Sequence, residues 1–116
     1  MNFELAWSAR ALSEYESLQQ AAAKSQKSRR AGSRGKASRQ AGLFKQVTKA
    51  IQLLAQNPRH PGLNSHKYAM LENPHQRGGD VFGIYAQNQT AAAYRVFWCY
   101  GSGKRVITII AITAHP

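Results

Sequence analysis

The sequence predicts an α+β fold in the order β-α-α-β-β-β, in which a two-helix hairpin packs on a small antiparallel-rich sheet. Two observations support this class. In the first half of the chain, apolar residues recur every three or four positions, which is the spacing of a helix that buries one face. Residues 94–116 instead hold two runs rich in Val, Ile, Thr and aromatic residues, joined by Gly-Ser-Gly.

The first half begins with a short strand and continues with two helices. Residues 3–7 alternate in the manner of a strand, and Ser8 is a suitable N-cap for a helix that we expect over about 9–23. The apolar spacing resumes at Leu43 and predicts a second helix that is closed by Asn57-Pro58. The two helices are expected to pair as a hairpin.

The stretch between the two predicted helices is strongly basic. Residues 24–49 contain nine Lys and Arg and no acid. Residues 25–39 carry almost nothing that could be buried, so we expect a mobile basic loop or frayed helix ends at the tip of the hairpin. This charge favours binding to ribosomal RNA phosphates, and the alternative is a solvated insertion without a partner.

The second half of the chain is predicted to form strands separated by turns. Residues 66–71 are a candidate edge strand, and residues 81–86 are a clearer one. The last two strands lie on either side of the Gly-Ser-Gly turn, where we expect Gly101 and Gly103 to supply the unusual backbone angles of a tight connection.

Composition limits the function classes. The 116 residues are expected to form one domain over 1–116, and 16 Lys and Arg against five Asp and Glu give a net charge of +11. This excess indicates a polyanionic partner, such as nucleic acid or an acidic protein, whereas no apolar run is long enough to span a membrane. The first residues show no secretory signal, and Cys99 is the only cysteine, so neither an internal disulfide nor a thiolate zinc site is expected. We therefore expect a cytoplasmic protein.

A series of short segments carries a family resemblance. In order, these are Trp7-Ser8-Ala9-Arg10-Ala11, Ile51 to Pro58 with Gly62-Leu63 beyond it, Lys67 to Leu71, Tyr94-Arg95-Val96-Phe97-Trp98, and Ile109 to His115. Together they resemble the RelE/ParE superfamily of bacterial type II toxins. The last two segments look like the family's Y-R-V-x-Y/F strand and its closing I-x-I-x-x-x-H segment. The resemblance covers most of the chain outside residues 25–39.

The resemblance implies a toxin that is neutralised by an acidic antitoxin protein. The family's ribonuclease branch binds in the ribosomal A site and cuts mRNA by attack of a ribose 2′-hydroxyl on the adjacent phosphate, without a metal or other cofactor. For this chain it implies Arg95 as the phosphate ligand and His115 as the acid or base, since an imidazole titrates near neutral pH. The alternatives are a ParE-like inhibitor of DNA gyrase, which needs no catalytic residue, and a catalytically degenerate RNA-binding member.

Strand alternation predicts where Arg95 points. It places Arg95 on the face of Phe97 and Cys99, opposite Val96 and Trp98. If the second pair packs on the helices, Arg95 points into the open face of the sheet; the alternative is an edge arginine in a surface ion pair. Cys99, without an evident base nearby, is expected to be an inert buried thiol.

Further residues are expected to bind RNA without doing chemistry. They comprise the basic stretch, two residues that lead into the sheet, one loop arginine, and two aromatic rings that can stack on bases. The set is Lys24, Lys27, Arg29, Arg30, Arg34, Lys36, Arg39, His66, Lys67, Arg77, Tyr85 and Phe97. For Tyr85 and Phe97 the alternative is burial in the core, and for His115 it is a solvated chain end.

Overall fold

The computed structural model describes residues 3–30, 36–63, 65–69, 71–86, 94–101 and 103–114, and for residues 25–30 and 36–41 it describes the backbone only. The elements are β1 (Glu4–Trp7), α1 (Ala9–Arg30), α2 (Lys36–Gln56), a 3₁₀ turn (Pro61–Leu63), β2 (His66–Lys67), β3 (Phe82–Tyr85), β4 (Tyr94–Tyr100) and β5 (Val106–Ala114). The predicted α+β class is confirmed. The candidate edge strand is present as β2, although it is only two residues long.

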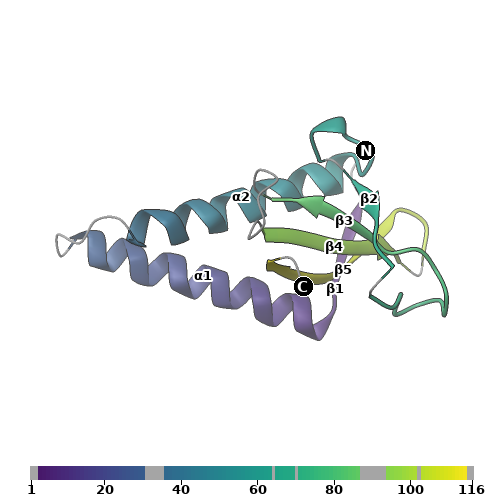
Figure 1. Ribbon diagram of the computed structural model, residues 1–116, viewed down its shortest axis with the longest axis horizontal. Helices are drawn as coiled ribbons and strands as arrows, with labels where there is room; N and C mark the ends of the chain where they lie inside the picture. Colours follow the sequence, from purple (N-terminus) through teal and green to yellow (C-terminus); the bar gives the residue numbers. More distant parts are fainter. Residues whose placement is uncertain are drawn as a thin grey trace.

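The sheet has the order β1-β5-β4-β3-β2. β1 pairs with β5 in parallel, and the other neighbours are antiparallel. The two helices run side by side and project past the end of the sheet at which β4 begins and β5 ends (Figure 1). This projection makes the molecule elongated, with dimensions of 49 × 26 × 25 Å.

Both helices extend further than the sequence predicted. Ser8 caps α1 as expected, since its Oγ accepts a hydrogen bond from the backbone N–H of Ala11 at 3.0 Å. However, α1 continues to Arg30 and α2 already begins at Lys36, so the described part of the stretch 25–39, for which a mobile loop or frayed helix ends were expected, is helical. The reason is intrinsic propensity: Lys, Arg, Gln and Ala are good helix formers even where they bury nothing. The predicted end of the second helix before Asn57-Pro58 is confirmed.

The sheet separates two groups of buried side chains. The larger group lies between the sheet and the helices and includes Val96 and Trp98. The smaller group lies on the opposite face and includes Phe97 and Cys99, with Tyr68 packed against it. The strand alternation predicted for residues 94–100 is therefore confirmed.

A bulge in β5 adjusts the pairing between the last two strands. Phe97 pairs with Ala111 while the next residue, Trp98, pairs with Ile109, so Ile110 is an extra residue in β5. As a result Ile110 and Ala111 both contribute to the smaller core group, on the open side of the sheet. The hydrophobic pattern alone does not reveal this insertion.

The turn between β4 and β5 uses its glycines differently from the prediction. Among the described residues of this turn, positive φ occurs at Arg105 (62°) and not at Gly101 or Gly103. Gly101 is needed for another reason: a Cβ there would lie 2.7 Å from the Thr108 Oγ1. The positive φ that we expected at a glycine therefore occurs at Arg105 instead. Close packing against Thr108 is the reason that position 101 holds a glycine.

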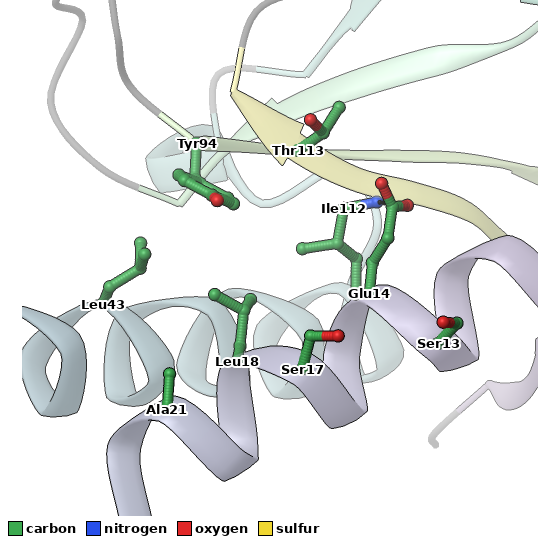
Figure 2. Close-up of a pocket in the computed structure, with 9 residues that line it drawn as sticks. All are labelled: Ser13, Glu14, Ser17, Leu18, Ala21, Leu43, Tyr94, Ile112 and Thr113. Carbon is green, nitrogen blue, oxygen red and sulfur yellow. Dashed lines mark hydrogen bonds between the residues drawn. The ribbon is translucent and has the colours of Figure 1, made fainter. Parts of the chain in front are cut away.

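The free edge of β5 is covered by a side chain of α1. β1 pairs with β5 only as far as Ile109, and beyond it the Glu14 Oε1 accepts a hydrogen bond from the Ile112 backbone N–H at 2.9 Å. Figure 2 shows the Glu14 carboxylate beside this nitrogen. An acidic side chain thereby satisfies an edge N–H that would otherwise be open to another strand.

Replacing Glu14 should lower stability measurably. Because a hydrogen bond to a charged group contributes about 1.5–3 kcal/mol when it is made, we expect Glu14→Ala to lower the free energy of unfolding by about 1–2 kcal/mol at this partly buried site. Glu16→Ala, which removes an exposed carboxylate from the same helix, is the matched control and should change it by less than about 0.5 kcal/mol. Urea unfolding followed by circular dichroism measures both, and equal losses would contradict this role.

Candidate functional site

Three of the predicted site residues lie together on the open face of the sheet. Arg95 pairs directly with Tyr85 across β3 and β4, and its guanidinium carbon lies 4.6 Å from the centre of the Tyr85 ring. The His66 ring, from the edge strand β2, lies 5.5 Å from the same ring, centre to centre. We call Arg95, Tyr85 and His66 the open-face row. It combines a permanent cation, an aromatic ring and an imidazole.

Arg95 retains unused hydrogen-bonding capacity. Its side chain is half-buried, and its Nε is buried without a hydrogen-bond partner. In the described part of the chain, the ion pairs are Arg10–Glu14 and Lys67–Asp80, so the alternative of a surface ion pair at Arg95 finds no support there. A buried donor without a partner is costly, and an anion arriving at this face would satisfy it.

Phe97 is a correction to the predicted set. It is fully buried in the smaller core group, with its ring 4.7 Å from that of Tyr68. A Cβ on Gly83 would approach the Phe97 ring to 3.2 Å, so the glycine in β3 allows this packing. Phe97 therefore cannot stack on a base, and its place below the open face is structural. A glycine inside an apolar strand is the sequence signal that could have indicated this close approach.

The basic stretch is separate from the open-face row. Lys24 is exposed on α1, Lys27, Arg29 and Arg30 also belong to α1, and Lys36 and Arg39 belong to α2. These helix ends form the part of the hairpin that projects beyond the sheet (Figure 1). Arg34 lies outside the described residues. The positive charge of the helical hairpin is therefore concentrated beyond the end of the sheet at which β4 begins.

The other predicted RNA contacts are dispersed. Lys67 is exposed on the edge strand, where its Nζ lies 3.5 Å from the Asp80 Oδ2. Arg77 is exposed in the long connection from β2 to β3, which extends past the opposite end of the sheet (Figure 1). His115 lies outside the described residues. Thr113, which the sequence reasoning missed, is the β5 partner of Arg95.

A hollow lies on the helix side of the sheet, near the beginning of β4 and the end of β5. It has a volume of about 380 Å³ and lies between α1, α2 and the ends of β4 and β5 (Figure 2). Leu18, Leu43, Tyr94 and Ile112 give it an apolar lining. None of the predicted site residues lines it, so it is not a candidate for the chemistry of Arg95.

Cys99 is buried in β4, and burial raises the pKa of its thiol above the usual value. The folded state therefore favours the neutral thiol over the thiolate. The contribution of Cys99 to the free energy of unfolding is fully present below about pH 8.5, where the thiol is neutral in both states. It is lost as the pH rises through the higher folded pKa, because the unfolded chain releases the proton more readily. We expect Cys99 to resist a thiol reagent in the native protein and to react after unfolding. Rapid labelling of the native protein would contradict its expected inertness.

The fold is that of RelE/ParE-type toxins, in agreement with the resemblance seen in the sequence. The chain is similar to a YoeB/ParE toxin from Agrobacterium tumefaciens (TM-score 0.61, 13% identity, 97% of this chain and 99% of that one). It is also similar to the YoeB dimer from Staphylococcus aureus (0.59, 12%, 100% of both chains). A third similar structure is a chain of the archaeal RelE-RelB complex from Pyrococcus horikoshii OT3 (0.53, 14%, 98% and 96%).

At these identities the similarity defines the fold alone. No family model and no curated protein matches the chain. Within the described residues, neither helix is long and apolar enough to cross a membrane. The functional conclusion therefore depends on the residues of the open-face row.

Proposed function

We propose that this protein is the toxin of a toxin–antitoxin pair and acts as an endoribonuclease on mRNA, at the ribosome. The observation that carries this proposal is Arg95, a half-buried guanidinium beside Tyr85 whose buried Nε has no partner. A half-buried guanidinium on the open face, with an Nε–H that has no partner, fits a phosphate group. The toxin fold and the +11 charge support the same conclusion.

The proposed reaction is a transfer within the RNA backbone. The ribose 2′-oxygen forms a bond to the adjacent phosphorus and loses its proton to a base, while the bond to the 5′-oxygen breaks and that oxygen receives a proton. Arg95 stabilises the negative charge that builds up on the phosphate oxygens. We assign one of these two proton transfers to His115, as the acid or the base, and His115 follows two residues after Thr113, the strand partner of Arg95.

Tyr85 and His66 are proposed to hold the RNA rather than to react. Tyr85 is half-buried beside the guanidinium and can stack on a base next to the bound phosphate. The basic helix ends, including Lys24, supply attraction for more distant phosphates, which should make binding strongly salt-dependent. An acidic antitoxin is the proposed protein partner, and a complex with RelB is known for the archaeal relative.

The test is to incubate the purified protein with translating ribosomes and map the RNA ends. The proposed reaction yields a 2′,3′-cyclic phosphate on one fragment and a 5′-hydroxyl on the other, and an mRNA with 2′-O-methyl groups should resist cleavage. Intact unmodified mRNA together with accumulated gyrase–DNA adducts would instead support the ParE-like alternative. Binding of RNA without either product would identify a degenerate RNA-binding member.

A further inference from the structure

A second aromatic surface lies on the opposite side of the sheet from Arg95. Phe82 and Trp98 stack with ring centres 4.9 Å apart, and Tyr100 meets Trp98 edge-on at 5.0 Å. We call these three residues the aromatic ledge. Tyr100 is 45% exposed, which is unusual for a large aromatic residue in a central strand. The ledge is therefore an apolar surface that the helices do not cover completely.

The ledge forms part of an open groove of about 540 Å³. Its walls are the segment after α2 and the edge strand, with the lining Pro58, Arg59, His60, Pro61, Ser65, His66 and Lys67. The volume is in the range of about 300–1,000 Å³ that small-molecule sites occupy. The groove is thus large enough for one nucleotide.

Trp98 lines the groove and carries a buried polar group that has no partner. The residue is only 2% exposed, and its indole Nε1 is buried without a hydrogen-bond partner. A buried N–H donor without an acceptor is uncommon in folded proteins, and it costs stability until an acceptor reaches it. An acceptor on a ligand that enters the groove deeply would pair with this N–H.

The charge around the groove selects an anionic ligand. Arg59, His60 and Lys67 line it, and Arg59 and Lys67 are exposed. Asp80, which lies 3.5 Å from the Lys67 ammonium, offsets part of this charge. His60 accepts a hydrogen bond at Nδ1 from the Gly62 N–H at 3.0 Å, so its neutral ring carries the proton on Nε2 and offers a donor there.

We propose that this groove binds one nucleotide of single-stranded RNA, outside the Arg95 site. The base stacks on the exposed Tyr100 ring, a base acceptor pairs with the Trp98 Nε1–H, and Arg59 and Lys67 contact the flanking phosphates. Aromatic floors with basic walls are the usual means by which proteins hold unpaired nucleotides. His66 both lines the groove and contacts Tyr85, so the groove adjoins the open-face row at the β2 edge.

The test uses the fluorescence of Trp98 itself. In a Trp7→Phe protein, Trp98 is the remaining tryptophan, and a short single-stranded 2′-O-methyl RNA should quench its emission as it binds. Tyr100→Ala keeps every charge and should weaken this binding about tenfold. Leu12→Ala, which removes an equally exposed apolar side chain from α1 (46%), should leave the affinity unchanged.

The same titration separates this groove from the proposed cleavage site. In an Arg95→Ala background the quenching should persist, since it requires no chemistry at Arg95. Unchanged affinity in Tyr100→Ala, or quenching by an acidic peptide in place of RNA, would overturn the proposal. If Trp7→Phe fails to fold, the indole N–H resonance of Trp98 in the ¹⁵N-labelled unsubstituted chain gives the same information: a shift on RNA addition supports the proposal, and its absence at saturation refutes it.

Discussion

Arg95→Ala should reduce mRNA cleavage by about 10²–10³-fold, the usual effect of removing one preorganised group that stabilises transition-state charge. The protein should stay folded, because the substitution also removes a buried Nε–H that has no partner. Arg95→Lys should restore only part of the activity, since an ammonium keeps the charge but lacks the planar fork that holds two phosphate oxygens. Cleavage is measured as the initial rate of fragment formation on translating ribosomes.

Two controls make the Arg95 result interpretable. Lys49→Ala removes one positive charge from an exposed position on α2 and should change the cleavage rate by less than about twofold at physiological salt, because screening limits the effect of a distant charge. Thermal unfolding should give similar midpoints for all the variants. If Arg95→Ala cleaves at the original rate, the assignment of Arg95 is wrong.

Phe97→Ala should have the largest effect on stability among the residues around the site. Truncating a fully buried phenylalanine costs about 3–5 kcal/mol, which is a large part of the roughly 5–15 kcal/mol that holds a domain together. The loss should appear as a lower urea midpoint, with a partly unfolded protein as the extreme outcome. Phe97→Leu keeps most of the apolar volume and should lose less.

RNA affinity then distinguishes core packing from stacking. Phe97→Leu should bind RNA as tightly as the unsubstituted chain, because Phe97 lies beneath the open face. Tyr85→Leu should weaken RNA binding severalfold at nearly unchanged stability, because Tyr85 borders the guanidinium of Arg95. A stable Phe97→Leu protein that had lost RNA affinity would mean that Phe97 contacts the ligand after all.

The orientation of the closing hairpin could be predicted from the sequence because it depends on local physics. β-branched and aromatic residues favour strands, and the two-residue alternation assigns Arg95 to the face opposite Val96 and Trp98. The N-cap at Ser8 and the end of α2 before Pro58 are equally local signals.

Other features depend on the register between strands, which a single sequence does not specify. The direct pairing of Arg95 with Tyr85, and the bulge at Ile110, follow from how β3, β4 and β5 align. Strand periodicity predicts only that Phe97 faces the same side of the sheet as Arg95. Its burial there depends on contact with Tyr68, which lies far away in the sequence. α1 is longer than the prediction because a run of Lys and Arg without apolar residues is as typical of a loop as of a helix end.

The central claim is that the Arg95 guanidinium on the open face binds an RNA phosphate. The most direct measurement is the ¹⁵Nε–H resonance of Arg95 as 2′-O-methyl RNA, which cannot be cleaved by this route, is added to the unsubstituted protein. We expect this resonance to shift and its proton to exchange more slowly with water, because the Nε–H gains an acceptor. An Arg95 resonance that stays unchanged while the RNA saturates other sites would contradict the account.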